Sequence, residues 1–231
     1  MTIVTGRTAV TLAAAGLLLA GCAAGPAPGR SAPGAAALVP VVARQATVPA
    51  AVEPAPVAAR PSLALSWLSI PSIGVHDLRV VAYVGWPDDP PGTEIEDHGL
   101  AASPRGTRGG VGPGVVGNFI VTGHRTAAGA PLRRLPDLQV GAHVLVRSGS
   151  SVFDYVVTAT MSVSFRSAAS MALQTAAVPG HPGRPATQPM VTLSTCATPE
   201  DHAQGNWWRD ALGNPEHRID KVGVLVAVRP V

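Results

Sequence analysis

Short apolar runs separated by glycine and proline are the feature of this sequence that most restricts its fold. Runs with the composition or alternation of strands lie at residues 63–70, 80–84, 118–122, 140–147, 152–159, 190–195 and 222–228. Residues 167–177 suit one short helix, but the connecting helices that a parallel α/β sheet needs are missing. About eight strands in roughly 170 residues therefore predict an all-β fold, either a closed barrel or a sandwich.

The composition argues against two other fold classes and one class of partner. With 25 Gly, 23 Pro and only 13% charged residues, the chain lacks the heptads of a coiled coil. The same helix breakers argue against a helical bundle. The net charge of +3 reflects arginines spread along the whole chain, without a basic cluster interleaved with aromatic residues. We therefore expect no nucleic-acid partner.

Residues 1–21 have the pattern of a signal peptide. Arg7 supplies the positive charge, and the uncharged run at 8–20 is too short for a comfortable membrane span. The run ends in the letters LAGC at residues 19–22, which resemble the bacterial lipoprotein box. This resemblance implies that Cys22 is lipidated on its sulfur and becomes the mature N-terminus. The alternative is an ordinary signal peptide in which the cysteine has no role.

Residues 22–61 form a separate segment by composition. They show no apolar period and contain eight prolines, few charges and no aromatic residue. Such a segment cannot bury a core, so we expect a disordered tether that is partly polyproline-like. It would hold the folded domain, residues 62–231, away from the membrane. A buried structural arm is the alternative.

Three residues beside predicted strands carry groups that work together in amide chemistry. His124 and Cys196 each follow a predicted strand, and Arg218 lies just before the last one. A thiolate is a strong nucleophile, an imidazole moves protons, and a guanidinium stabilises an oxyanion. Together they suffice for amide cleavage through a thioester, which water or another amine then resolves. Taken singly, each has a plainer role: a buried apolar cysteine, a turn histidine or a solvated arginine.

The sequence motifs around these residues resemble those of the sortases, which are cysteine transpeptidases on the surface of Gram-positive bacteria. Residues 122–125 (TGHR) match the family's T-G-H motif, and residues 193–196 (LSTC) match its T-L-x-T-C motif. Residues 68–75 (LSIPSIGV) match its L-x-I-P-x-I-G-V opening, and residues 135–141 are similar as well. The resemblance covers about residues 65–228. The wording and the actinobacterial composition look most like class E sortases.

The resemblance implies a closed eight-stranded sortase-like β-barrel with one or two short helices and no cofactor. Cys196 would be the nucleophile and His124 the acid and base. Arg218 would stabilise the oxyanion or hold the substrate backbone, and Thr195 would contribute beside the nucleophile. The reaction would cleave a sorting motif of LPxTG or LAxTG type in a secreted protein, between Thr and Gly. The acyl group would then pass to an amine of a peptidoglycan precursor or of a pilin lysine.

Two features depart from the family pattern. The family's arginine usually lies closer to the cysteine, whereas 21 residues separate Cys196 from Arg218. Lys221 and Arg209 are alternatives for the cationic role, and we favour Arg218 because it is an arginine close to the last strand. Sortases usually carry an uncleaved transmembrane helix, whereas Cys22 lies in a lipoprotein box. Both forms of anchor place the domain on the extracellular face of the membrane.

The segment between Cys196 and Arg218 supplies candidate substrate contacts. Trp207 and Trp208 would offer rigid apolar area to a peptide, although one of them would equally serve to cover the barrel end. We expect no metal site in the chain. The acidic cluster at residues 94–97 is small for Ca²⁺, and no paired cysteine spacing suits Zn²⁺.

The sequence therefore predicts a lipid-anchored, extracellular, sortase-like cysteine transpeptidase. Two alternatives stay open. One is a thiol peptidase that uses the same residues for hydrolysis alone. The other is a barrel-shaped lipoprotein without enzymatic activity that binds peptides or cell-wall fragments, with Cys196 buried.

Overall fold

The computed structural model describes residues 63–231 of the chain. The expected signal peptide at 1–21, the lipidated Cys22 and the tether at 22–61 lie outside the described residues. In the described part, no helix combines the length and the apolar character needed to cross a bilayer.

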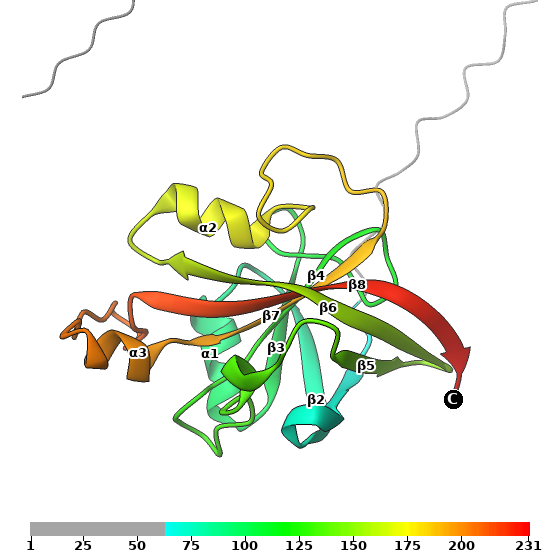
Figure 1. The fold of residues 1–231 in the computed structure, drawn as a ribbon, viewed down its shortest axis with the longest axis horizontal. Coiled ribbons are helices and arrows are strands. Elements are labelled where there is room, and N and C mark those ends of the chain that lie inside the picture. Colours follow the sequence, from blue (N-terminus) through cyan, green and yellow to red (C-terminus); the bar gives the residue numbers. More distant parts are fainter. Residues whose placement is uncertain (1–62) are drawn as a thin grey trace, which may run out of the picture. The chain divides into compact units, whose positions relative to one another are not determined.

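Eight strands form the body of the described chain. They are β1 (Ser66–Ile70), β2 (Val75–Val84), β3 (Ala101–Arg105), β4 (Gly117–Thr122), β5 (His143–Ser148), β6 (Ser151–Ser164), β7 (Pro189–Cys196) and β8 (His217–Pro230). They close into a barrel in the order β1-β2-β3-β4-β7-β8-β6-β5, with β5 pairing back to β1 (Figure 1). The predicted closed barrel is confirmed, and the sandwich is excluded.

The helices are more numerous than predicted. Besides α2 (Ala168–Thr175), which the sequence predicts, the described chain has α1 (Pro90–Asp97) and α3 (Thr198–Ala203). Two 3₁₀ turns, η1 (Pro71–Ile73) and η2 (Leu135–Asp137), add to them. The prediction of one or two short helices was therefore wrong. The sequence did not indicate α1, because two prolines and a glycine begin it and are typical of a loop. The prolines are tolerated because they occupy the first helical positions, where a missing N–H costs nothing.

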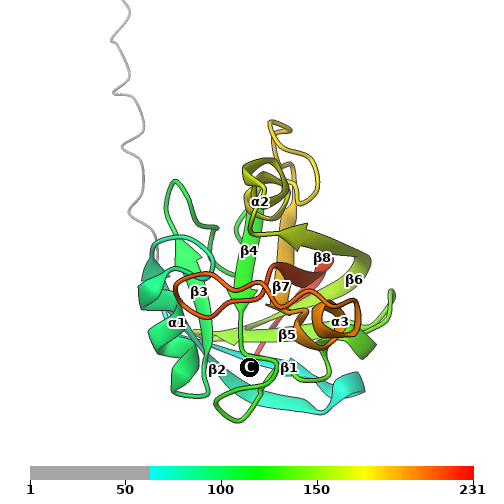
Figure 2. The same ribbon diagram turned by 90° about the vertical axis from the view of Figure 1, so that its left-hand side faces the viewer.

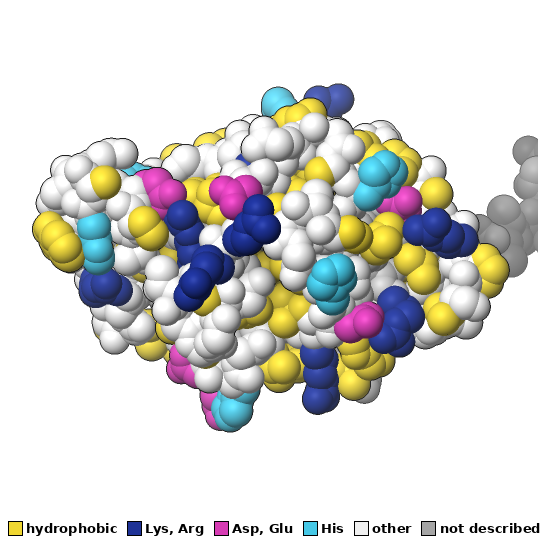
Figure 3. All heavy atoms as spheres, turned by 60° about the horizontal axis from the view of Figure 1, so that its bottom comes forward, with side chains coloured by type: hydrophobic (Ala, Val, Ile, Leu, Met, Phe, Trp, Pro, Cys, Tyr) yellow, Lys and Arg dark blue, Asp and Glu magenta, His cyan; other side chains and the backbone are white. Residues whose placement is uncertain are grey.

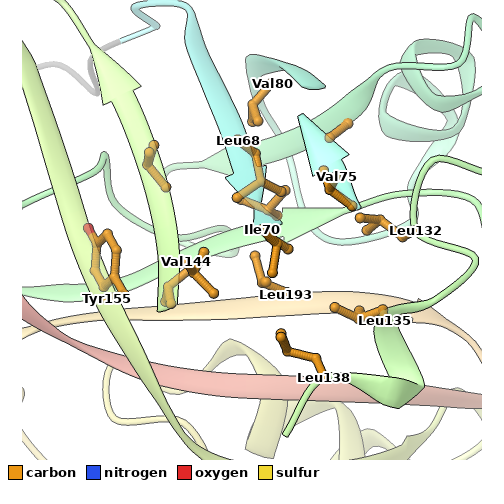
Figure 4. Packing of buried hydrophobic residues seen from close by; sticks show 14 of the residues in the cluster. Leu68, Ile70, Val75, Val80, Leu132, Leu135, Leu138, Val144, Tyr155 and Leu193 are labelled. Atoms are coloured by element: carbon orange, nitrogen blue, oxygen red, sulfur yellow. The ribbon is translucent and has the colours of Figure 1, made fainter. Parts of the chain in front are cut away.

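The core fills the interior of the barrel. Side chains from β1, β4, β5 and β7 and from the turn around η2 meet there (Figure 4). Its fully buried members include Leu68, Ile70, Phe119, Val121, Leu132, Leu135, Val144, Val146 and Leu193. The alternating pattern of the strands sends these residues inward, so every second residue of β4 and β7 faces the outside of the barrel.

A buried polar layer holds α2 against that outer face. Thr192 of β7 donates its hydroxyl to Asn118 Oδ1 at 2.8 Å, and Asn118 Nδ2 donates to the carbonyl of Gln174 at 2.8 Å. Gln174, which is fully buried, donates through Nε2 to Ser194 Oγ at 2.9 Å. These bonds fix α2 on the barrel beside the last residues of β7.

Two parallel pairs set the geometry of one barrel end. β2 pairs in parallel with β3, and β4 pairs in parallel with β7, whereas the other neighbouring strands are antiparallel. The carboxyl ends of β4 and β7 therefore lie at the same end of the barrel. β8 runs antiparallel to β7, so its first residues reach that end as well.

The last strand begins earlier than the sequence indicates. The apolar pattern predicts its start at residue 222, whereas β8 begins at His217. Residues 217–221 pair with both β6 and β7, which buries the polar side chains of Arg218, Asp220 and Lys221. The expectation that Arg218 precedes the strand was wrong. Residues 217–221 are polar, but they form a strand because β6 and β7 pair with them on both sides.

One face of the described chain shows how its basic side chains lie among other groups. On the face drawn in Figure 3, Lys and Arg side chains are spread among acidic and histidine side chains. Several arginines pair with carboxylates, such as Arg125 with Glu200 and Arg218 with Asp88. This distribution agrees with the scattered arginines of the sequence.

Candidate active site

The three predicted catalytic residues come from three adjacent strands at one barrel end (Figure 2). Thr122 of β4 is in register with Ser194 of β7, so His124 and Cys196 each stand two positions further along. Across the next pair, Cys196 is in register with Arg218 of β8. The fold therefore brings together residues that are 72 and 22 positions apart in the sequence.

Backbone and hydroxyl bonds tie the segment carrying His124 to β7. Gly123 N donates to the Ser194 carbonyl at 3.2 Å, and the buried Thr195 hydroxyl donates to the Gly123 carbonyl at 2.7 Å. A Cβ at Gly123 would lie 2.9 Å from Leu132 Cδ1, so a side chain there would force this close contact apart. Thr195 thus joins the two sides of the site.

Arg125, the residue after His124, adds a second connection. Its Nη1 donates to the Cys196 carbonyl at 3.3 Å. Its guanidinium also forms a two-pronged ion pair with Glu200 of α3, in which Nη2 donates to Oε1 at 2.9 Å. Such planar pairing fixes orientation as well as distance. The TGHR segment is therefore held against both the end of β7 and the helix that follows it.

The Arg218 side chain is fully buried and held from several sides. Its Nε donates to Asp88 Oδ2 at 3.3 Å, and its guanidinium lies 4.1 Å from the centre of the Phe165 ring. Nη1 donates to the carbonyls of Pro215 and His217, each at 3.3 Å. Nη2 is buried and has no hydrogen-bond partner in the described part of the chain. One nitrogen of this fixed cation thus makes no hydrogen bond within the described residues.

The charge of Arg218 is secured by its surroundings. Burial by itself would lower the pKa of Arg218, but Asp88 and the Cys196 sulfur outweigh burial, so this pKa is raised. Asp88 reaches the guanidinium from a left-handed backbone conformation, with φ of 59°. That region is uncommon for residues other than glycine, and Asp tolerates it better than most. The turn before α1 is thus shaped to present this carboxylate.

The two alternative cations make different contacts, although Arg209 also opposes the rise in the pKa of the Cys196 thiol. Lys221 sits in register with Leu193, and its Nζ donates to the Pro136 carbonyl and to Thr160 Oγ1, both at 3.0 Å. Arg209 is exposed and donates to the Gly213 carbonyl at 2.7 Å. Neither is paired across the strands with Cys196. This geometry favours Arg218 for the cationic role.

The Cys196 thiol is free and half-buried. Burial raises the pKa of the Cys196 thiol to about 11; Arg218 opposes this rise, whereas Asp88 and Glu96 add to it. At neutral pH the thiol therefore carries its proton. Conversion to the reactive anion needs a base and a stabilised charge distribution around the sulfur.

His124 contacts two acidic residues that the sequence reasoning did not connect with it. Its Nε2 lies 2.9 Å from Asp97 Oδ1, and its Nδ1 lies 3.7 Å from Glu96 Oε2. Both carboxyls come from the last turn of α1. The signal was present in the sequence, since these residues form the acidic cluster before His98. The sequence alone does not show that a helix forms there and reaches Thr122 of β4, so it offers the cluster only as a candidate calcium site.

The remaining predicted contacts lie in the loop between α3 and β8, which crosses this end of the barrel in Figure 2. Trp207 is 68% exposed, and its ring stacks on His202 with centroids 3.8 Å apart. Trp208 is half-buried, and Arg166 lies 5.8 Å from its ring centre. Among residues 63–231, no group of three or more His, Cys, Asp or Glu side chains is arranged to hold a metal ion.

Comparison with known proteins identifies what this arrangement is similar to. Residues 68–209 match the family model described as the Sortase domain. No curated protein matched the chain.

Solved structures share the fold. The SrtA sortase from Actinomyces oris superposes with a TM-score of 0.54 at 19% identity, over 74% of this chain and 84% of that chain. Sortase E1 from Streptomyces coelicolor, solved with a tripeptide in the active site, gives 0.53 at 21% identity, over 72% and 90%. Sortase E from Streptomyces avermitilis gives 0.52 at 22% identity, over 74% and 91%.

Proposed function

Since this chain belongs to the sortase family of cysteine transpeptidases, we propose that Cys196 cleaves a sorting motif of LPxTG or LAxTG type between Thr and Gly. The substrates would be secreted proteins that carry this motif. The acyl group would pass to an amine of a peptidoglycan precursor or of a pilin. The observation that carries the proposal is the placement of His124, Cys196 and Arg218 on three adjacent strand ends.

The first step is the transfer of the thiol proton to His124. With a thiol pKa of about 11, roughly one molecule in 10⁴ would hold a free thiolate at pH 7. The sulfur then attacks the carbonyl carbon of the scissile amide, and the carbonyl oxygen becomes an oxyanion. When the C–N bond breaks, His124 returns the proton to the departing amine, and a thioester on Cys196 remains. The incoming amine attacks the thioester carbonyl carbon and gives a proton to His124. The C–S bond then breaks, the new amide leaves, and His124 returns the proton to the Cys196 sulfur.

Arg218 is suited to the oxyanion. Its unpartnered Nη2 offers a donor that no protein group occupies, and its other nitrogens are held by Asp88 and by carbonyls. A donor that is fixed before the reaction stabilises developing charge without reorganisation. The neighbouring Asp88 keeps the guanidinium in place but leaves this nitrogen free.

The subclass and the peptide contacts follow as part of the same proposal. The TGHRT wording and the likeness to the sortase E folds of Streptomyces support a class E enzyme. The tripeptide in the active site of the Streptomyces coelicolor protein supports peptide binding at the corresponding end here. The exposed ring of Trp207 and the half-buried ring of Trp208 would contact such a peptide. Thr195 would contribute to the site beside Cys196, where its hydroxyl donates to the Gly123 carbonyl.

Location and attachment complete the proposal. The catalytic domain, residues 62–231, would stand on the extracellular face of the membrane, held by a lipid on Cys22 and a tether at 22–61. A lipid anchor serves the same purpose as a transmembrane helix, because both keep the enzyme near secreted chains and near cell-wall amines.

The test uses the full chain with dye-labelled peptides that contain LPxTG or LAxTG, with and without excess oligoglycine. We expect mass spectrometry to find the acyl–oligoglycine product, and Cys196→Ala to yield no turnover. Cys22→Ser is the matched control, because it removes the other cysteine and should retain full turnover on soluble peptides.

Other outcomes assign the alternatives. Hydrolysis alone in excess amine would identify a thiol peptidase. Cleavage at full rate by Cys196→Ala would exclude the proposed mechanism. Binding of these peptides without cleavage would point to the non-enzymatic lipoprotein.

A further inference from the structure

The end of α1 presents two carboxyls to the candidate general base. Asp97 Oδ1 lies 2.9 Å from Nε2 of His124, and Glu96 Oε2 lies 3.7 Å from Nδ1 of the same ring. The His124 side chain is 15% exposed, so these contacts cover much of it. One helix turn therefore contacts both ring nitrogens.

Glu96 is an acidic residue of α1 whose carboxyl is buried. It is 4% exposed, and its Oε1 accepts a hydrogen bond from the Thr122 hydroxyl of β4. Thr122 lies two residues before His124 on the same chain segment. A buried carboxyl is costly unless its partners compensate, and Thr122 alone satisfies one oxygen. The fold thus keeps a buried carboxyl beside the end of β4, two residues before His124.

We propose that Glu96 and Asp97 are positioning residues that hold the His124 imidazole between them. The inference rests on the proposed function, since it assigns His124 the proton transfers of that reaction. Asp97 accepts a hydrogen bond from Nε2, which fixes the ring orientation from its exposed side. Glu96, which accepts a hydrogen bond from Thr122, faces the second nitrogen from the buried side. A ring held in one orientation is placed for proton transfer without rearrangement.

The surroundings of Glu96 make its ionisation measurable. Burial raises the pKa of Glu96 to about 8; Asp88 and Asp97 add to this rise, whereas Thr122 and Arg218 oppose it. The ionisable groups that face it are Asp88 from the turn before α1, Asp97 from α1, Tyr83 from β2, His124 after β4, Cys196 of β7 and Arg218 of β8. Glu96 thus changes charge in the range where a transpeptidase works.

Nuclear magnetic resonance of the full chain, without substrate, tests the contact directly. The signal of His124 among the seven histidines is assigned from its absence in His124→Asn. In the wild-type protein we expect this signal to show a step near pH 8, caused by ionisation of Glu96. Glu96→Gln should remove that step, because the amide still accepts from Thr122 but no longer ionises. An identical titration of His124 in both proteins would overturn the inference.

A matched control lies on the same helix. Glu94 is exposed and lies two residues before Glu96, so Glu94→Gln removes one charge from the same helix. It should leave the step near pH 8 in place. Loss of the step in Glu94→Gln as well would assign the effect to general charge, and would overturn the specific role of Glu96.

Turnover gives a second readout. Glu96→Gln should lower kcat by about 10- to 100-fold with little change in KM, since the substrate contacts are intact and only the acid–base geometry is lost. Thr122→Val should shift activity in the same direction, and Thr122→Ser should restore it, because serine keeps the hydroxyl. A fall in thermal stability without these kinetic effects would identify a merely structural carboxyl.

The two proposals fail separately. If the chain does not transfer acyl groups but the His124 step near pH 8 disappears in Glu96→Gln, the contact stands and the sortase reaction does not. If transpeptidation proceeds and His124 titrates identically in wild type and Glu96→Gln, the sortase reaction stands and the positioning role is wrong.

Discussion

At the scale of single residues, the site contains one buried cation and three buried acidic side chains. Arg218 is surrounded by Asp88, Glu96 and Asp220, all of which are buried. Burial is the main cause of the raised pKa of the Cys196 thiol, and Asp88 and Glu96 add to it, while the same two acids favour the charged form of Arg218. The thiol therefore carries its proton at neutral pH. Its reactivity depends on proton transfer during the encounter with substrate.

Arg218→Lys tests the oxyanion role at this scale. Lysine keeps the positive charge but lacks the planar guanidinium. It therefore loses both the bond from Nε to Asp88 and the unpartnered Nη2. We expect kcat to fall by about 10² or more, measured by peptide cleavage. Arg209→Gln is the control, since that side chain is exposed, and it should retain activity. Full activity in Arg218→Lys with loss in Arg209→Gln would transfer the role to Arg209.

At the scale of elements, Gln174 joins α2 to two strands of the barrel. Gln174 Nε2 donates to Ser194 Oγ at 2.9 Å and to Asp220 Oδ1 at 3.1 Å. Burial raises the pKa of Asp220 to about 7, while Ser194 and Gln174 oppose the rise. The folded chain therefore holds a proton on Asp220 that the unfolded chain releases near pH 4.

This linkage predicts how stability changes with pH. Because the Asp220 pKa is raised on folding, its contribution is fully favourable below about pH 4 and is lost as the pH rises towards about 7. Asp220→Asn cannot ionise, so its melting temperature relative to wild type should rise between pH 4 and pH 8. Asp77→Asn, which replaces an exposed carboxyl, is the control and should show no such trend. A constant difference between Asp220→Asn and wild type would contradict the assignment.

Elements also mark the limit of what the sequence could predict. The barrel follows from the alternation and the turns. Matched motifs indicate His124 and Cys196, whereas Arg218 was chosen only as an arginine close to the last strand. β3 was missed because its five residues, AASPR, are small or contain proline, although all five are buried. The early start of β8 was missed because Arg218, Asp220 and Lys221 read as solvated. Their burial depends on partners from β6 and β7, which lie far away in the sequence.

At the scale of the whole molecule, the described chain is a small barrel that carries its chemistry at one end. Residues 63–231 form eight strands and three short helices. We propose that delivery to substrates depends on what holds the barrel in place. The lipoprotein box at residues 19–22 is the proposed answer.

Cys22→Ser tests that answer in cells. Without the thiol, no thioether lipid can form, so we expect the variant to lose both the label from a metabolic fatty-acid probe and its place in the membrane fraction. Cys196→Ala is the control and should be labelled like wild type. Equal labelling of Cys22→Ser and wild type would contradict the lipid anchor.

The parallel pairing of β4 with β7 has a consequence for how such a protein can diversify. The connection that contains α2 enters β7 at Pro189, seven residues and roughly 23 Å before Cys196. Residues 177–188, the part of that connection after α2, can therefore vary at a distance from the reacting atoms. Phe165 and Gln174, earlier in the connection, cannot, because they contact Arg218 and Ser194. The reaction can thus be inherited unchanged while the stretch that leads into β7 is rewritten.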